Sequence, residues 1–219
     1  MGARTCSLAC DDPRFGLVTQ IDLESNTKPV NNPGTPIDAV IDFSSDEGAR
    51  SAVRIALEHH AAVLVGTTGL TRQTLADIEV ATRTISVMVA PNTSLGVAVL
   101  NHLAAVTAGL LGPRYGVNLI EVHHTQKRDA PSGTALRIAD TLRRAGAELP
   151  DECVHAIRSG DVIGEHTVEF AGGGERVRIS HAATSRDLFV RGALEAIAWL
   201  HGRPPGRYAI EQSLGLGTA

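Results

Sequence analysis

Glu-Val-His-His-Thr-Gln-Lys-Arg-Asp-Ala-Pro-Ser-Gly-Thr-Ala-Leu, residues 121–136, is the stretch of this chain that is richest in chemically usable side chains. The preceding residues 117–120 alternate small polar and apolar side chains, which is typical of a strand. Apolar residues then recur at the spacing of one buried helix face, at Ala135, Ile138, Ala139 and Leu142. The sequence therefore predicts a strand that runs into a polar loop, and a loop that runs into a helix.

The end of this loop predicts a place for an anion. Pro131 and Ser132 stand where the cap or the first turn of the helix is expected. Gly133 and Thr134 would then offer free backbone N–H groups at the positive end of the helix dipole. Such an end binds a carboxylate or a phosphate, so we expect these residues to hold the anionic part of a substrate.

The start of the loop carries groups for proton transfer. His123, His124 and Lys127 supply two imidazoles and an ammonium, which suit proton transfer and anion binding at neutral pH. A single histidine beside a strand end is more often hydrogen-bonded scaffolding, and a helix cap is usually only a cap. Because these features coincide within one loop, we interpret the stretch as the site of an anionic substrate that must be protonated.

The composition is that of a soluble globular protein, because 219 residues with 43% hydrophobic and 20% charged side chains can form one large or two modest domains. The formal net charge of −4 gives no basic field, so we expect a small-molecule partner and no nucleic acid. Cys6, Cys10 and Cys153 are too few for a disulfide framework or a metal cluster, which favours a reducing cytoplasm and no bound metal. We expect that no stretch reaches the length of a membrane span, and we expect no membrane partner.

The first half of the chain repeats a strand-then-helix pattern. Residues 38–43 and 61–65 are apolar runs of the kind that buried parallel strands show. Ser44-x-x-Glu47 has the pattern of a capping box and predicts the start of a helix between these two strands. A second helix is expected over 71–82 and a third strand over 85–89. Strands that alternate with helices in this way predict a parallel α/β sheet.

Polar loops follow the second and the third of these strands. In open α/β sheets, ligands bind outside the carboxyl ends of the strands, so two neighbouring loops of this kind predict a crevice for a ligand. The loop residues are Gly66, Thr67 and Thr68 after the second strand, and Ala90, Pro91, Asn92 and Thr93 after the third.

The second half has a different pattern. Residues 95–111 form an alanine-rich apolar stretch, which predicts a helix that connects two domains. Residues 166–170 and 176–180 alternate in polarity around a glycine-rich turn, so we expect a hairpin of an antiparallel sheet. Apolar residues from Val190 onward predict a final helix that ends near Gly202.

Residues 15–22 read as an apolar strand that ends in Asp22. In a dinucleotide-binding fold, an acid at this place accepts hydrogen bonds from the adenosine ribose hydroxyls. It normally follows a glycine-rich turn by about 20 residues, and here only Met1-Gly2 lies at that distance. Leu23 follows Asp22 where a cation would suit a 2′-phosphate, which favours NADH over NADPH.

Glu-x-His-His-x-x-Lys-x-Asp-Ala-Pro-Ser-Gly-Thr-Ala, at residues 121–135, resembles the signature of the dihydrodipicolinate reductase (4-hydroxy-tetrahydrodipicolinate reductase) family. The resemblance continues through residues 66–69, 90–97, 164–168 and 191–194, and so covers nearly the whole chain. It implies a Rossmann-like doubly wound parallel sheet, whose first strand is missing here, and an inserted α+β substrate domain with a mixed or antiparallel sheet.

The resemblance also implies that the chain forms two domains with different functions. Residues 1–95, to which residues 187–219 return, would form the dinucleotide-binding domain. Residues 96–186 would bind the substrate and join the subunits of a homotetramer.

The activity implied is hydride transfer from NADH or NADPH that converts 4-hydroxy-tetrahydrodipicolinate into tetrahydrodipicolinate, with loss of water, in lysine and diaminopimelate biosynthesis. The family's acid-base positions match His123 and Lys127. Its carboxylate-binding positions match His124, Ser132, Gly133 and Thr134, while the loops at residues 66–68 and 90–93 border the nicotinamide.

Two departures from the family pattern leave an alternative open. The Gly-x-x-Gly-x-x-Gly phosphate loop is absent, and the polar connection between Leu142 and His155 looks shorter than in the family. The alternative is a catalytically silent binding or assembly protein that has lost its dinucleotide site. We expect the missing loop to reflect a truncated start, and the chain as written to bind dinucleotide poorly.

Overall fold

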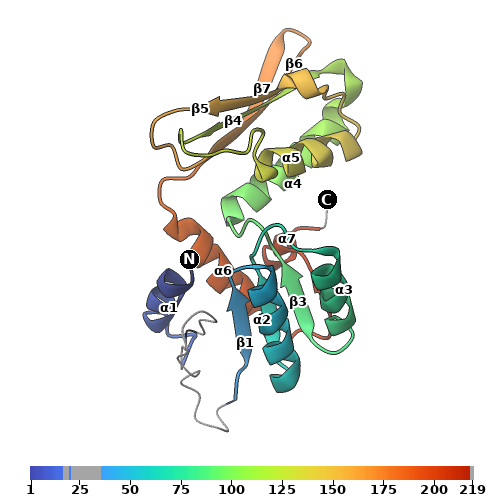
Figure 1. Ribbon diagram of the computed structural model, residues 1–219. Coiled ribbons are helices and arrows are strands. Elements are labelled where there is room, and N and C mark those ends of the chain that lie inside the picture. Colours follow the sequence, from blue (N-terminus) through green and yellow to red (C-terminus); the bar gives the residue numbers. More distant parts are fainter. Residues whose placement is uncertain (17–19, 21–35, 218–219) are drawn as a thin grey trace. The chain divides into compact units, whose positions relative to one another are not determined.

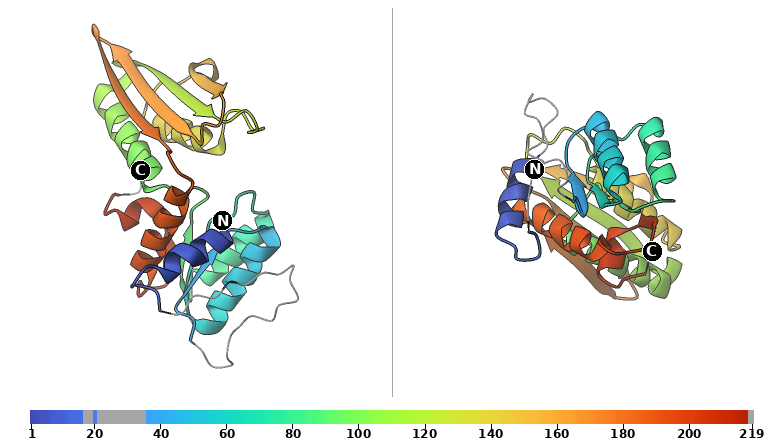
Figure 2. Two further views of the ribbon diagram at one scale, coloured as in Figure 1. Left: turned by 90° about the vertical axis from the view of Figure 1, so that its left-hand side faces the viewer. Right: turned by 90° about the horizontal axis from the view of Figure 1, so that it is seen from below.

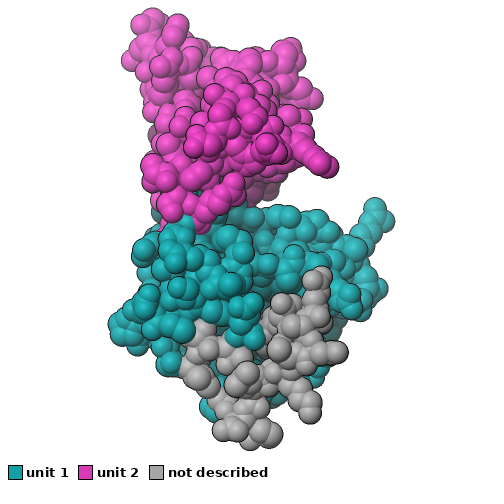
Figure 3. Space-filling view, turned by 60° about the vertical axis from the view of Figure 1, so that its left-hand side comes forward, with its two compact units in different colours: residues 1–94, 187–218 teal, residues 95–186, 219 magenta. Residues whose placement is uncertain are grey.

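The computed structural model describes residues 1–16, 20 and 36–217. The chain divides into two compact units, which Figure 3 distinguishes by colour. Unit 1 comprises Met1–Ser94 and Asp187–Thr218, and unit 2 comprises Leu95–Arg186. Asp22 and residues 21–35 lie outside the described residues, as does most of the strand expected over 15–22; Phe15 and Gly16 belong to no strand.

Unit 1 contains a parallel sheet of four strands in the order β1-β2-β3-β8, of which β1 and β3 are labelled in Figure 1. Their bounds are β1 Ala39–Asp42, β2 Ala62–Val65, β3 Ser86–Val89 and β8 Gly206–Tyr208. The middle strand β2 is buried along its whole length, as expected of a parallel strand that is covered on both faces. The three strands predicted from residues 38–89 are confirmed, whereas β8 was not predicted.

Helices cover both faces of this sheet (Figure 2). On one face, α2 (Asp46–His59) and α3 (Arg72–Ala81) bury alanine, valine and isoleucine side chains against β2 and β3. On the other face, α6 (Asp187–Leu200) packs across β1, β2 and β3, and α1 (Gly2–Cys10) packs on α6. A short helix, α7 (Ile210–Ser213), also contacts α6. This two-sided covering is the doubly wound arrangement that was predicted.

The cap of α2 differs by one residue from the prediction. Ser45 is the N-cap and its side chain accepts a hydrogen bond from the Gly48 amide, whereas Ser44 hydrogen-bonds to Asp42. A Cβ atom at Gly48 would lie 2.0 Å from the Ser44 hydroxyl, so the missing side chain of Gly48 makes the space that Ser44 occupies. The predicted Ser44–Glu47 capping box is therefore wrong.

Unit 2 contains a mixed sheet in the order β5-β4-β6-β7, in which β5 is parallel to β4 and the other pairs are antiparallel. Its strands are β4 Gly116–His123, β5 Val154–Arg158, β6 Glu165–Gly172 and β7 Glu175–Ala182. Helices α4 (Leu95–Leu111) and α5 (Gly133–Arg144) form a shared apolar core with the sheet, and the short 3₁₀ turns η1 (Gly112–Arg114) and η2 (Asp151–Cys153) precede β4 and β5. The predicted strand–loop–helix around residues 117–142 and the β6–β7 hairpin are both confirmed.

The expectation that no stretch reaches the length of a membrane span is wrong. The helical segment Leu95–Arg114 has 20 residues and a mean hydropathy of 1.7, so by length and composition alone it could cross a membrane. In unit 2, however, Leu100, Ala104 and Ala108 recur every four residues and pack into the core with α5 and the sheet. The apolar length of α4 is therefore used, at least in part, to build the core of unit 2.

Candidate functional site

The alternation of side chains along β4 places two polar residues at the end of a buried face. Val117 and Leu119 point into the core of unit 2, and by the same period of two Glu121 and His123 point the same way. Glu121 is fully buried, and His123 is 8% exposed. The strand thus delivers a carboxylate and an imidazole to the place where the core meets the loop before α5.

Glu121 is the centre of a hydrogen-bond network. Its Oε1 accepts hydrogen bonds from the Ser132 backbone amide at 3.2 Å and from the Arg158 guanidinium at 3.0 Å. Its Oε2 is hydrogen-bonded to Nδ1 of His123. One carboxylate therefore joins β4, β5 and the N-terminus of α5, and it was not among the residues selected from the sequence.

The other side of the His123 ring faces β6 and the turn before it. A Cβ atom added to Gly164 would lie 3.0 Å from Nε2 of His123, so any larger residue at this position would crowd this nitrogen. The His166 ring meets the His123 ring edge to face, with centroids 5.3 Å apart. His166 is 4% exposed, and neither of its ring nitrogens has a hydrogen-bond partner in the described part of the chain.

The buried position of these rings lowers their pKa values. Burial is the main cause for His123, and the cations Lys127 and Arg158 act in the same direction, while the hydrogen bond and the charge of Glu121 raise its pKa. Burial and the neighbouring His123 lower the pKa of His166 to about 4. Both rings therefore release a proton more readily than a histidine in water.

The loop after β4 is organised by an ion pair. Nζ of Lys127 lies 2.8 Å from both carboxylate oxygens of Asp129, and this hydrogen bond is the main reason that the pKa of Asp129 is lowered. The backbone amide of Gly133 contributes to the same shift. Arg158 donates hydrogen bonds to the backbone carbonyls of Lys127 and Asp129, which ties the loop to β5. Asp129 therefore lies among the predicted anion-binding groups.

The predicted substrate-binding residues lie at the N-terminus of α5. Ser132 is the N-cap, with its Oγ accepting a hydrogen bond from the Ala135 amide at 3.1 Å. Gly133 is the first residue of the helix and is exposed, and Thr134 is half-buried. His124 is half-buried, and its carbonyl accepts a hydrogen bond from the Lys127 amide. These positions are compatible with anion binding, and the assignment stays a prediction.

In unit 1, two of the three predicted cofactor residues in the loop after β2 also make contacts that stabilise the fold. A Cβ atom at Gly66 would lie 2.3 Å from the Phe43 ring, so this glycine is required by local packing. Thr67 is buried and its hydroxyl accepts a hydrogen bond from the Ser44 amide, whereas Thr68 is exposed. Of the three predicted cofactor residues in this loop, Thr68 has the most accessible side chain.

The loop after β3 is held from two sides. The buried Thr93 donates a hydrogen bond of 2.6 Å to the Phe189 carbonyl, which fixes the loop to α6. Asn92 accepts one from the Ser94 amide, and the amide of the buried Ala90 donates to the Val65 carbonyl. Pro91 is exposed. Thr93 and Ala90 therefore position the loop, while Asn92 and Pro91 are more accessible to a ligand.

One observation fits a polar ligand at this sheet edge. Asp42 ends β1, next to the loop after β2, and is 4% exposed. Its Oδ1 is hydrogen-bonded to Ser44, but its Oδ2 has no hydrogen-bond partner within the described residues. Buried carboxylate oxygens are normally satisfied, so a hydroxyl or amide of a bound nucleotide would supply the expected donor.

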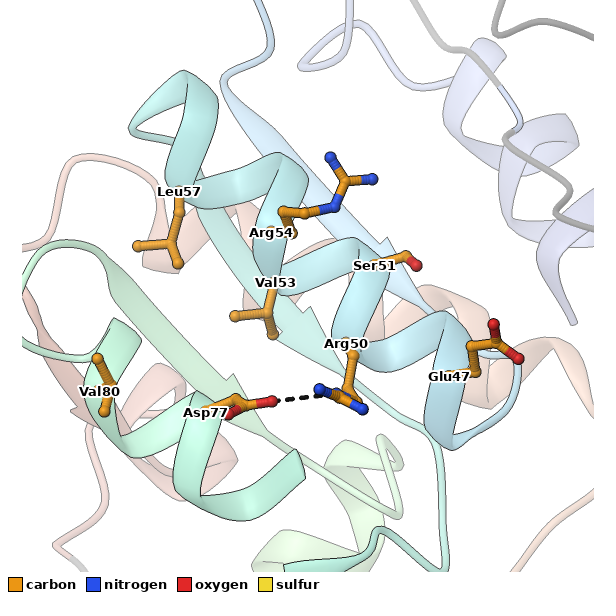
Figure 4. Close-up of a pocket in the computed structure, with 8 residues that line it drawn as sticks. All are labelled: Glu47, Arg50, Ser51, Val53, Arg54, Leu57, Asp77 and Val80. Atoms are coloured by element: carbon orange, nitrogen blue, oxygen red, sulfur yellow. Dashed lines mark hydrogen bonds and ion pairs between the residues drawn. The ribbon is translucent and has the colours of Figure 1, made fainter. Parts of the chain in front are cut away.

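A separate pocket lies in the groove between α2 and α3 (Figure 4). Arg50 of α2 forms an ion pair with Asp77 of α3 there, at 3.0 Å. None of the residues that line this pocket was predicted as a site residue. They are Glu47, Arg50, Ser51, Val53, Arg54, Leu57, Asp77 and Val80.

Glu121, His123 and His166 bring ligand atoms within 4.8 Å of one another, a spacing at which a metal ion could be held. However, both oxygens of Glu121 already accept hydrogen bonds, and Lys127 and Arg158 add positive charge. A divalent cation would have to displace these partners. The arrangement fits proton transfer better than metal coordination.

The geometry can be compared with known proteins. The family described as "Dihydrodipicolinate reductase, N-terminus" matches residues 1–93, and the one described as "Dihydrodipicolinate reductase, C-terminus" matches residues 96–214. Together the two families account for nearly the whole chain.

Curated relatives and a solved structure agree with this match. A 4-hydroxy-tetrahydrodipicolinate reductase of Anaeromyxobacter dehalogenans is 41% identical over 197 residues, which cover 82% of this chain and 73% of the relative. One of Stenotrophomonas maltophilia is 44% identical over 183 residues, 83% of this chain and 75% of the relative. The dipicolinate-bound dihydrodipicolinate reductase from Paenisporosarcina sp. TG-14 is 23% identical, with a TM-score of 0.67 over 78% of this chain and 71% of that one. This structural likeness confirms the predicted fold class.

Proposed function

Because the chain belongs to the dihydrodipicolinate reductase family, we propose that it reduces 4-hydroxy-tetrahydrodipicolinate to tetrahydrodipicolinate in lysine biosynthesis. The reaction consumes one hydride and one proton and releases one water. The observation that carries the proposal is the junction of β4 and α5, where hydrogen bonds of Glu121 and Arg158 join His123, the loop of Lys127 and the N-terminus of α5. No observation favours the catalytically silent alternative.

The chain's own groups have distinct tasks in this reaction. The N–H groups at Gly133 and Thr134, with His124, Lys127 and Ser132, would bind the two carboxylates of the substrate. Lys127 would then exchange Asp129 for a substrate carboxylate, since both are anions of the same kind. This exchange would place the substrate ring within reach of the accessible Nε2 of His123.

His123 would supply the proton of the reaction. Its buried ring has a lowered pKa, so the imidazolium is a stronger acid than a histidine in water. NADH or NADPH supplies the hydride when bound. In unit 1, the polar strand ends after β1, β2 and β3 fit such a ligand, because parallel strands bring their carboxyl ends to one edge. Asp22, the predicted ribose ligand, lies outside the described residues.

Three finer points belong to the same proposal. We favour NADH, because Leu23 rather than a cation follows Asp22. The half-buried Val122 and the exposed Ile157 pair on the face of the unit 2 sheet opposite the core, which supports subunit contacts in a homotetramer. Cys6, Cys10 and Cys153 are free, which suits the cytoplasm.

The test is steady-state kinetics with the hydroxy-tetrahydrodipicolinate substrate. His123→Ala and Lys127→Ala should each lower kcat by about 10² or more, since proton transfer and electrostatic stabilisation contribute that much. Arg54→Ala, which breaks an exposed ion pair with Glu58 on α2, is the matched control and should keep the wild-type rate. Wild-type turnover in both His123→Ala and Lys127→Ala would remove the loop from the reaction.

A further inference from the structure

We infer that Glu121 is a positioning residue, which holds Nδ1 of His123 so that Nε2 is the nitrogen that exchanges a proton with the substrate. The inference rests on the proposed function, because it assumes that His123 is the proton donor. It adds a residue to that function, and it fixes which of the two ring nitrogens reacts.

The burial of Glu121 calls for an explanation beyond packing. It lies on the same face of β4 as Val117 and Leu119, where an apolar side chain would serve the core. Burying a carboxylate is costly unless it is paired and hydrogen-bonded. Here the cost is offset by three donors, namely the Ser132 amide, the Arg158 guanidinium and the His123 ring.

The hydrogen bond to Glu121 determines which nitrogen of the His123 ring carries a proton. An ionised carboxylate can only accept hydrogen bonds, so Nδ1 must carry the proton that is shared with Oε2 of Glu121. In the neutral ring, Nε2 then has a free lone pair, and in the imidazolium Nε2 carries the proton that is available for transfer. The same relation between a buried carboxylate and an imidazole fixes the tautomer in hydrolase triads.

The space on the other side of the ring agrees with this orientation. The missing side chain of Gly164 leaves room beside Nε2 of His123, whereas Nδ1 is hydrogen-bonded to Glu121. Arg158 donates a hydrogen bond to Glu121 and also to the backbone carbonyls of Lys127 and Asp129. The position of the proton donor is therefore coupled to the loop that is proposed to bind the substrate.

The charged and titratable groups around His123 come from four elements. Glu121 lies on β4, Arg158 on β5, His166 on β6, and Lys127 on the loop before α5. Glu121 is the group that raises the pKa of His123, and it opposes burial, Lys127 and Arg158. Removing its charge should therefore lower the pKa of the proton donor further.

The decisive variant is Glu121→Gln, which keeps the size of the side chain. Its amide oxygen can still accept from Ser132 and Arg158, which leaves the NH₂ group facing Nδ1 of His123. Because NH₂ is a donor, the neutral ring should move its proton to Nε2. Nitrogen-15 NMR of histidine-labelled protein at pH 8 should show an Nδ1–H tautomer for His123 in the wild type and an Nε2–H tautomer in the variant.

Kinetics give a second readout. In Glu121→Gln, kcat should fall by about tenfold or more while KM changes less than about threefold, because the substrate-binding groups remain in place. The alkaline limb of the kcat profile should move to lower pH, since the donor loses its proton earlier. Glu121→Asp, which keeps the charge, should retain the wild-type tautomer and a smaller kinetic loss.

Glu169→Gln is the matched control. Glu169 is a mostly buried carboxylate on β6 that pairs with Arg178 of β7, away from His123. Its replacement should change neither the tautomer of His123 nor the pH profile. A wild-type His123 that carries its proton on Nε2 at pH 8 overturns the inference, even if Glu121→Gln does not fold. An unchanged tautomer and pH limb in a folded Glu121→Gln overturn it as well.

The two failures can be told apart. The NMR measurement needs no substrate, so it tests the hold of Glu121 on His123 even if the wild type does not reduce hydroxy-tetrahydrodipicolinate. Failure of the proposed function would show as wild-type turnover in His123→Ala. Failure of the present inference would leave His123→Ala inactive and Glu121→Gln unaltered.

Discussion

At the scale of single residues, the site depends on a glycine beside His123. Gly164 lies next to Nε2 of His123, and a Cβ atom there would lie 3.0 Å from that nitrogen and 3.3 Å from Cδ2. Such contacts are tighter than ordinary van der Waals packing, and His123 cannot move away easily because Glu121 holds Nδ1. The small size of this residue therefore belongs to the chemistry of the site.

We predict that Gly164→Ala lowers kcat by about tenfold or more, because the methyl group hinders Nε2 and shifts the ring. Gly109→Ala on α4 is the control: a Cβ atom there meets nothing within 4 Å, and alanine favours helix. Kinetics and thermal melts of both variants separate the effects. A Gly164→Ala enzyme with full activity would show that Nε2 is not used.

At the scale of elements, a glycine of unit 1 that was predicted to bind the cofactor is required for packing. Gly66 directly follows β2, and its missing side chain accommodates the Phe43 ring that follows β1. The sequence predicted this glycine as a cofactor residue, because it lies in a loop at the carboxyl end of a parallel strand. The Phe43 ring lies where a side chain of this residue would be, and the cofactor role of Gly66 stays a prediction.

We predict that Gly66→Ala lowers the free energy of unfolding by about 1–3 kcal/mol, because the added methyl group overpacks against Phe43. Combining it with Phe43→Ala should relieve the clash, so the double variant should be more stable than the sum of the single effects. Urea unfolding of the four proteins measures this coupling. Strict additivity would mean that Gly66 and Phe43 do not restrict each other.

The elements that the sequence predicted well have a strong periodic signal. The repeat at Ala135, Ile138, Ala139 and Leu142 predicted α5, and the apolar run at 61–65 predicted β2, because burial on a helix or a central strand constrains every residue. The three-residue strand β8 carries no such period, and it forms only because β3 offers a free edge. Short elements of this kind depend on contacts that are distant in sequence.

The residues of the site divide in the same way, into those that are close together in the sequence and those that only the fold brings together. His123, Lys127 and Ser132 lie within ten residues of each other, so their coincidence was visible in the sequence. Arg158 and His166 reach the same place through strand pairing with β4, and although residues 164–168 belong to the family resemblance, neither residue was predicted for the site. Glu121 was quoted in the motif, but its role depends on the direction of its side chain, which only the structure shows.

At the scale of the whole molecule, buried histidines link stability to pH. The pKa of His166 is lowered to about 4 from 6.5, and the pKa values of His123 and His181 are lowered as well, mainly by burial. A lowered histidine pKa means that the unfolded chain binds protons at a pH where the folded chain does not. The folded state is therefore most stable above the unfolded pKa, and it loses stability as the pH falls toward the folded pKa.

For His166 this window runs from the ordinary histidine pKa of 6.5 down to about 4. We predict that protonation of His166 in the unfolded chain decreases the free energy of unfolding in this range by up to about 1.4 kcal/mol per pH unit. His166→Phe keeps a ring beside His123 but cannot be protonated, so it should remove the share of His166. Urea unfolding followed by circular dichroism between pH 8 and pH 5 measures the two slopes.

The comparison of the two proteins isolates His166 from the other titrating groups. Above about pH 7.5 the difference in their stability should be constant, since His166 is neutral in both the folded and the unfolded chain. Below pH 6.5 the wild type should lose stability faster than His166→Phe, because only its unfolded chain gains a proton at this position. Parallel curves down to pH 5 would contradict the prediction, and would mean that His166 titrates alike in both states because water or a rearranged neighbour reaches its nitrogens.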